Sequence, residues 1–273
     1  ISFLGPDYKD EVVENNRVQM FGNHLGEIPP FFQEFESDPN TTKLFRKTVF
    51  AASEDYTVYN NKKGNAILKL ISPIVNGIQM IKTFEAIPDS YILNYSVQLI
   101  NRSKEIKPLK TLYFFGEQRL ADNGGGMHQV SHEGPVFFYD ESLQTESSDE
   151  IENEMTVTMM KWLGVEDQYF IGAVAPETPV RNGFFRAGMY FSESKSQARG
   201  ERKLSPYFGV ALPPTDLKPN LQIESNFKLY YGPKADEELV KFGYKLEMSH
   251  DMTLEVLAGP LLDLLRFIYG LVG

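Results

Sequence analysis

The histidines are the first residues to test for metal or acid–base chemistry. The chain contains four of them: His24, His128, His132 and His250. His128 and His132 are four residues apart with Glu133 beside them, a spacing that on a helix would let two imidazoles reach one zinc ion. Three glycines at 124–126 precede the pair and favour a loop, in which that spacing loses its geometric meaning. We therefore expect no metal site and no cofactor.

Carboxylates are the second source of acid–base chemistry. Glu166 and Asp167 are adjacent, and Glu117 follows an apolar stretch, so each could supply a general acid or base. Because the chain has 37 acidic residues, such clusters also arise by chance, and the pattern selects no pair. We therefore predict no catalytic residues and a protein that is not an enzyme.

Two segments are predicted to be loops. Residues 121–134 are rich in glycine, and no Lys-Ser or Lys-Thr follows the glycines as it would in a P-loop. Residues 140–154 are dominated by Asp, Glu and Ser, without the spacing or central glycine of an EF-hand. We expect this acidic run to be a solvated, mobile loop.

Short strands must position whatever site the chain carries. Alternating or continuous apolar residues between turn signals predict strands at residues 44–50, 56–59, 66–71, 78–86, 91–100, 109–115, 155–162, 168–174, 183–191, 207–212 and 221–231. The clearest is 91–100, where Leu93, Tyr95, Val97 and Leu99 share one face and mostly polar residues the other. This period of two is typical of a half-buried antiparallel strand.

Only two stretches look helical, residues 234–242 and the C-terminal tail. The predicted fold is therefore all-β, with residues 1–232 forming a domain of antiparallel strands and 233–273 a helical segment of the same structural unit. A formal charge of −10 disfavours nucleic acid as a partner. The absence of cysteine excludes disulfides.

The tail is apolar around most of its circumference. In a helix that starts at Pro260, Asp263, Arg266 and Gly270 fall on one narrow face and apolar residues cover the rest. Roughly 13 helical residues are too few to span a bilayer, which takes about 20. Two interpretations stay open: a closing helix packed on the core, or a helix lying in a membrane interface. The residues expected to form the interfacial helix are Pro260, Leu261, Leu264, Leu265, Arg266, Phe267 and Ile268.

The chain has no basic segment followed by an apolar one at its start, and no run of 18 apolar residues. It is thus expected to be an excised segment whose anchors or signals lie outside it.

Four stretches carry motifs that can be compared with known families. Residues 160–176 contain Trp followed by Tyr-Phe-x-x-Ala-x-x-Pro, and residues 229–234 contain a Tyr-x-Gly-Pro-Lys step. Residues 82–101 contain Lys-Thr-Phe, Tyr and Asn in order, and the tail contains Pro-Leu-x-x-Leu-Leu. The motif residues of the first two stretches are Trp162, Tyr169, Phe170, Pro176, Gly232 and Pro233. In this order and spacing, the set resembles the YidC-type bacterial membrane protein insertases of the YidC/Oxa/Alb family.

The resemblance implies the large first periplasmic domain of such an insertase. That domain is a galactose-mutarotase-like β-supersandwich followed by helices, on the periplasmic side of the bacterial inner membrane. It implies a non-catalytic structural or partner-docking module in a protein that inserts and folds membrane proteins, alone or with the Sec translocon. The implied partners are the protein's own transmembrane domain, Sec components, client membrane proteins and, through the tail, the membrane interface. The alternative is a sugar-binding or mutarotase-like domain, because the same fold hosts such functions.

Overall fold

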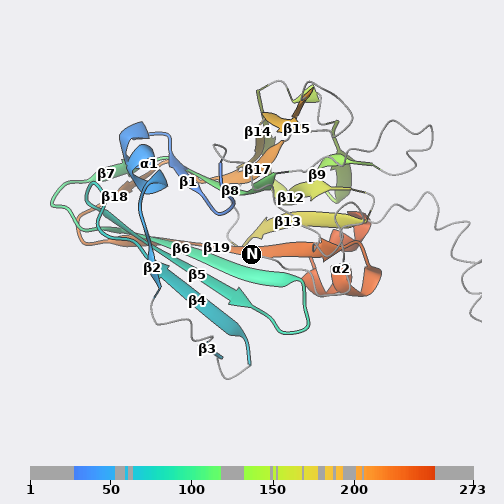
Figure 1. Ribbon diagram of the computed structural model, residues 1–273, viewed down its shortest axis with the longest axis horizontal. Coiled ribbons are helices and arrows are strands. Elements are labelled where there is room, and N and C mark those ends of the chain that lie inside the picture. The colour runs from blue at the N-terminus through green and yellow to red at the C-terminus, as the bar shows by residue number, and fades with distance from the viewer. Residues whose placement is uncertain are drawn as a thin grey trace, which may run out of the picture.

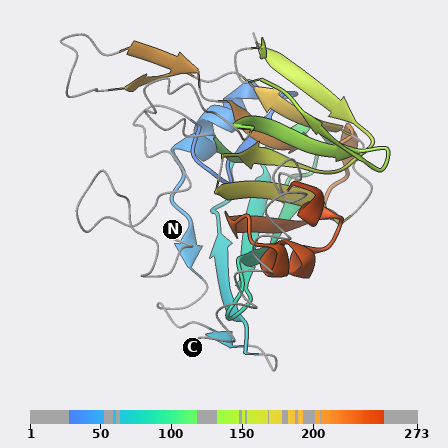
Figure 2. The same ribbon diagram turned by 90° about the vertical axis from the view of Figure 1, so that its right-hand side faces the viewer.

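Antiparallel strands dominate the computed structural model of this chain (Figure 1 and Figure 2). The structure describes residues 28–52, 59–60, 64–117, 132–147, 150–151, 153–167, 169–177, 182–186, 189–192, 201–204 and 206–249. The predicted tail helix and the predicted loop at 121–131 lie outside these residues. The all-β prediction is confirmed for the described chain, as is the prediction of antiparallel pairing.

The larger sheet has ten strands in the order β10-β9-β12-β13-β19-β6-β5-β4-β2, with β3 beside β4. Their bounds are β2 (Ala51–Ala52), β3 (Tyr59–Asn60), β4 (Ala66–Ile71), β5 (Ile78–Ala86), β6 (Ile92–Asn101), β9 (Gly134–Tyr139), β10 (Ser142–Thr145), β12 (Met160–Glu166), β13 (Phe170–Pro176) and β19 (Gln222–Pro233).

The smaller sheet has five strands in the order β1-β8-β17-β14-β11. Their bounds are β1 (Gln33–Phe35), β8 (Thr111–Glu117), β11 (Glu154–Thr158), β14 (Asn182–Arg186) and β17 (Tyr207–Ala211). Two further sheets have two strands each. One pairs β7 (Lys107–Leu109) with β18 (Thr215–Leu217), and the other pairs β15 (Met189–Ser192) with β16 (Glu201–Leu204).

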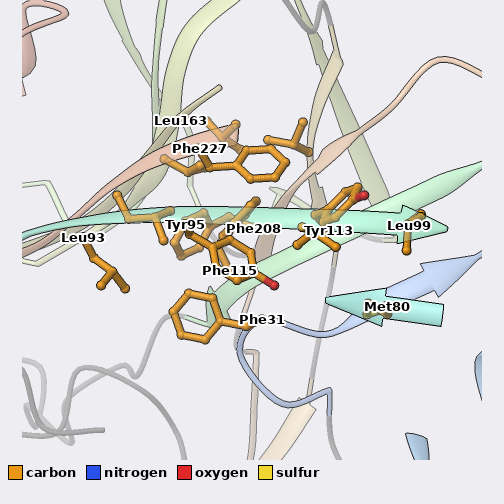
Figure 3. Packing of buried hydrophobic residues seen from close by; sticks show 14 of the residues in the cluster. Phe31, Met80, Leu93, Tyr95, Leu99, Tyr113, Phe115, Leu163, Phe208 and Phe227 are labelled. Carbon is orange, nitrogen blue, oxygen red and sulfur yellow. The ribbon is translucent and has the colours of Figure 1, made fainter. Parts of the chain in front are cut away.

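The main core lies between the two sheets. On β6, Leu93, Tyr95, Val97 and Leu99 are at most 4% exposed, as the period of two predicted. Aromatic side chains of the two sheets meet here, and Phe227 of β19 packs on the rings of three partners from both sheets (Figure 3). The sheets are therefore held together by interdigitated rings, which bury much apolar area per residue.

A helix replaces the strand predicted at residues 44–50. α1 (Pro39–Arg46) takes the first three residues of that stretch and no strand forms in the rest, so the strand prediction is wrong, and so is the prediction of only two helical stretches. The physical reason lies just upstream, where the Asp38 carboxylate accepts a hydrogen bond from the Thr41 N–H at 3.0 Å and Pro39 sits in the first turn. An aspartate cap followed by proline is a strong helix start.

Removing this cap gives a measurable prediction. Hydrogen bonds from Thr41 hold the pKa of Asp38 below its usual range, and Asn76 adds a further bond. Asp38→Ala is expected to lower the free energy of unfolding by about 1 kcal/mol at neutral pH. Because the pKa of Asp38 is lower in the folded than in the unfolded state, the stabilisation by its carboxylate is present above the unfolded value of about 3.8 and is lost as the pH falls through the folded pKa. The difference from wild type should therefore shrink as the solution becomes more acidic than about pH 3.8.

Urea titrations of wild type, Asp38→Ala and Asp38→Asn measure this effect, since asparagine keeps a capping oxygen without the charge. An equal Asp38→Ala difference at neutral and acidic pH would contradict the role of the carboxylate.

The acidic run and two predicted strands need correction. β10 lies inside residues 140–154, and β11 begins at Glu154, so the prediction of a loop throughout is wrong. The glycine-rich segment likewise ends in β9, which begins at Gly134. Residues 155–162 are two strands in different sheets, broken at Met159 with a φ of 56°, and 183–191 likewise covers β14 and β15. An exposed edge strand such as β10 needs no alternation of apolar and polar residues, so its polar sequence gave no sign of a strand.

Helices close the described chain. α2 (Asp236–Phe242) confirms the helix predicted at 234–242, and the short 3₁₀-helix η2 (Leu246–Ser249) follows it. Figure 2 shows this segment outside the larger sheet, on the face away from the smaller one.

Candidate anchoring site of the C-terminal segment

Strand register brings most of the motif residues together. β13 lies between β12 and β19, which puts Phe170 opposite Pro233, Ile171 opposite Gly232, and Pro176 opposite Phe227. The two motif stretches, distant in sequence, are thus neighbouring strands. Tyr169 is the exception, since it lies at the tip of the β12–β13 turn with 65% of its surface exposed.

Trp162 connects this part of the sheet to the C-terminal helices. Its side chain is 0% exposed and stacks on Phe138 of β9, with the ring centroids 6.2 Å apart. Its indole Nε1 donates a hydrogen bond to the backbone oxygen of Tyr244 at 3.2 Å. The indole thus packs on the sheet and also binds the chain between α2 and η2.

A second apolar core lies on this outer face of the larger sheet. Leu239 and Phe242 of α2 and Leu246 of η2 are each 0% exposed. The buried members of this outer core are Ile92, Val136, Phe138, Trp162, Ile171, Ala173, Ala175, Tyr230, Leu239, Phe242 and Leu246. Burying a side chain of this size stabilises by about 1.5–3 kcal/mol, so the helical segment is firmly attached to the strands.

The turn between α2 and η2 has an unusual backbone. Gly243, Tyr244 and Lys245 have φ values of 79°, 56° and 63°, and side-chain-bearing residues rarely adopt such values. Lys228 donates to the Phe242 oxygen at 2.6 Å and lies over the rings of Phe242 and Tyr244. Together with the Trp162 bond, these contacts hold the turn in its strained form.

Glu141 ties the β9–β10 hairpin to the same turn. Its carboxylate binds Lys161 of β12 and, at 2.5 Å, Lys245. The hydrogen bonds from these two ammonium groups lower the pKa of Glu141 to about 2. Because all three side chains are well exposed, the pairs contribute only modestly to stability. They nevertheless link the edge of the larger sheet to the turn between α2 and η2.

The carboxylates considered for acid–base chemistry have structural partners. Glu166 forms an ion pair with Lys234, with Oε2 and Nζ 3.2 Å apart and both side chains at most 4% exposed. Asp167 accepts hydrogen bonds from the backbone N–H groups of Tyr169 and Phe170, both at 2.7 Å. The N–H of Lys234 also donates to the Tyr169 oxygen at 2.8 Å. These groups join the β12–β13 turn to the end of β19.

Close packing explains the glycine of the Gly-Pro step. A Cβ atom on Gly232 would lie 2.5 Å from the ring of Tyr91. A side chain there would force the aromatic ring off the strand, so only glycine fits.

Sequence reasoning missed the residues that hold the turn, namely Glu141, Lys228, Tyr244 and Lys245. No local pattern marks them, because their contacts depend on strand register. Among the described residues no group of three potential metal ligands exists. The Nε2 atom of His132 lies 3.1 Å from the backbone oxygen of Pro135. His24, His128, His250 and the predicted interfacial residues 260–268 lie outside the described chain.

The inner face of the larger sheet is filled by side chains around Tyr95 and Phe227. Tyr95 and Phe227 are each 1% exposed, and Phe31 enters from the segment before β1 and packs on Tyr95. This filling does not favour the sugar-binding alternative.

Comparisons with known proteins agree on one family. The family model described as YidC periplasmic domain matches residues 6–264. A protein named membrane protein insertase YidC from Aromatoleum aromaticum is 23% identical over 83% of this chain and 40% of its own length. One of the same name from Neisseria gonorrhoeae is 22% identical over 97% of this chain and 50% of its own. The chain thus spans half or less of these two relatives.

Solved structures with low similarity include sugar-active enzymes. A galactose mutarotase related enzyme from Lactobacillus acidophilus has a TM-score of 0.40 and 12% identity, covering 68% of this chain and 72% of its own. A putative aldose 1-epimerase from Escherichia coli K12 has a TM-score of 0.39 and 11% identity, covering 67% and 68%. In the part of the chain that the structure describes, no helix has the length and apolar character needed to cross a bilayer.

Proposed function

Since this chain belongs to the family of YidC periplasmic domains, we propose that it is the extracytoplasmic domain of a bacterial inner-membrane insertase. Its role there is non-catalytic: it is a rigid module that holds the chain leading to the membrane part of the protein. The whole protein inserts and folds membrane proteins, with client proteins and components of the Sec translocon as its partners.

The observation that carries this proposal is the attachment of the last described helices to the sheet. Leu239, Phe242 and Leu246 are 0% exposed, and Trp162 binds the strained turn between α2 and η2. A connection this well packed supports a rigid attachment of α2 and η2 to the larger sheet. For the described residues, it is consistent with the strands and the helices after residue 232 forming one structural unit.

The non-catalytic part of the proposal rests on the carboxylates. Glu166 and Asp167, the adjacent pair considered for acid–base work, are engaged with Lys234 and with backbone N–H groups.

The tail forms the membrane-contacting part of the proposal. Residues 260–268 combine a narrow polar face with many leucines, which suits a helix lying in the membrane interface. In this arrangement Asp263 and Arg266 face water or lipid headgroups, and Leu261, Leu264, Leu265 and Ile268 face lipid or the membrane half of the protein.

The test uses the full-length protein in cells depleted of their own insertase. Replacing Leu261, Leu264, Leu265 and Ile268 with glutamine is expected to reduce client insertion about fivefold or more, because the helix loses its apolar face. The matched control is Asp263→Asn with Arg266→Gln, which alters the polar face and should retain insertion. Normal insertion by the glutamine variant at equal protein level would refute the role of the tail.

A further inference from the structure

Lys82 is a cation on the inner, apolar face of the larger sheet. It lies between Met80 and Phe84 on the same face of β5, and its register partners are Leu70 on β4 and Val97 on β6. Among the described residues no carboxylate lies within ion-pair distance of its ammonium group. Its contacts there are the backbone oxygen of Phe31, at 2.8 Å, and the ring of Phe50, whose centroid is 4.8 Å from Nζ.

Phe31 covers Lys82 in a strained conformation. Its φ is 62°, in the left-handed region that side-chain-bearing residues adopt only at a cost in free energy. Its ring packs on Phe84 and Tyr95, each with centroids 5.1 Å away, and is only 6% exposed. Figure 3 shows Phe31 at one margin of the aromatic cluster rather than in its middle.

The Phe31 oxygen is the point on which two donors converge. The buried amide of Gln33 donates to it at 2.8 Å, in addition to the Lys82 ammonium group. Gln33 is fixed in turn by a 3.0 Å bond to the Tyr95 hydroxyl. The pocket that Phe31 fills, called the Phe31 pocket, is lined by Gln33, Lys82, Phe84, Tyr95 and Tyr231.

The group that Lys82 binds in this pocket, the neutral carbonyl of Phe31, does not balance the positive charge of the lysine. A backbone carbonyl is neutral, whereas the ammonium group above it is cationic and largely removed from water, and burial lowers the pKa of Lys82 to about 8. A carboxylate at the same place would form charge-assisted hydrogen bonds with the lysine and the glutamine amide, and such bonds are roughly twice as strong as neutral ones. The aromatic walls would hold a ring in offset or edge-to-face contact.

We propose that the Phe31 pocket is a binding site for an aromatic ring that carries a carboxylate, the chemistry of a C-terminal phenylalanine of a peptide. In the structure Phe31 itself occupies the site with its ring and its neutral carbonyl. Release of the strained Phe31 backbone offsets part of the free energy needed to displace it. The site is independent of the anchoring role proposed above, because it lies on the opposite face of the sheet.

The test compares two soluble probes with the same ring, N-acetylphenylalanine and its neutral amide. Phe31→Ala in the whole chain removes the ring but keeps the backbone carbonyl of residue 31, which the carboxylate of the probe must displace from Lys82 and Gln33. Calorimetric titration is expected to show about tenfold tighter binding of the carboxylate than of the amide. Wild type should bind the carboxylate about tenfold more weakly than Phe31→Ala, because its own ring competes. Adding Lys82→Met should abolish the preference, whereas adding Lys69→Met, which removes an exposed cation of β4, should preserve it.

Equal affinities for the two probes, or no binding by a Phe31→Ala chain that melts cooperatively, would overturn the proposal. If that variant fails to fold, wild type can be photolabelled with free 4-benzoylphenylalanine, which has both the ring and the carboxylate. Labelling within β5 or β6 that N-acetylphenylalanine suppresses is the expected result, and labelling found only elsewhere, or none at all, sinks the idea.

Discussion

Lys234→Ala is expected to lower the free energy of unfolding by about 3–5 kcal/mol, more than removing a charge from any of the exposed ion pairs among the described residues. The side chains of Lys234 and Glu166 are at most 4% exposed, and their charged atoms lie 3.2 Å apart. Removing the ammonium group leaves the carboxylate in a site that water reaches poorly, without the cation that neutralises it. Most of the loss would come from this buried charge rather than from the lost attraction.

A double variant separates these two contributions. Glu166→Gln with Lys234→Met removes both charges and roughly conserves volume, so it should recover much of the stability lost by Lys234→Ala. Lys241→Ala provides the control, since Lys241 forms an exposed pair with Glu238 and should change stability by less than about 1 kcal/mol. Denaturant midpoints measure all three, and a Lys234→Ala loss as small as that of Lys241→Ala would contradict the buried-pair account.

Trp162→Ala should be about as damaging, with a loss of about 3–5 kcal/mol for a large buried ring. The indole is 0% exposed and carries both the stack on Phe138 and the bond to the Tyr244 oxygen. The loss should be concentrated at α2 and η2, because these helices cover the face that the indole supports. The substitution should therefore increase the amide hydrogen-exchange rates of Leu239 and Leu246 more than those of residues in β5 or β6.

Trp162→Phe is the matched control for the hydrogen bond. Phenylalanine keeps an aromatic ring on Phe138 but cannot donate to Tyr244, which should cost about 1 kcal/mol for the bond and somewhat more for the lost volume. Uniformly faster exchange across the sheet in Trp162→Ala would argue against a local anchoring role. Unchanged exchange in α2 and η2 would argue against it more directly.

The interior strands of the fold were predictable from the sequence because their buried positions carry apolar residues in a regular pattern. Ile78–Ala86 matches the predicted strand residue for residue, and β6 differs by one residue at each end. α1 was not predicted, although Asp38 and Pro39 signal a helix start. The apolar residues from Leu44 onwards favour a strand and mask that signal. β10 was missed because a charged edge strand is specified by its partner β9 rather than by its own pattern.

The anchoring site was predictable only as a set of motif residues. Trp162, Phe170 and Gly232 stood out by their spacing, and register shows why they belong together. Contacts such as Lys234 with Glu166 join residues from strands that the sequence does not reveal as neighbours. Left-handed residues such as Tyr244 give no signal either, since nothing in their type predicts a positive φ.

The position of β19 has a mechanical consequence. This strand has twelve residues, is hydrogen-bonded on one side to β6 and on the other to β13, and leads directly into α2. A force applied to the chain beyond Ser249 would first have to peel the helices from the outer core, and would then load β19 along its length. In that geometry the hydrogen bonds of β19 to β6 and to β13 would be loaded together, so tension would act on the longest of the described strands.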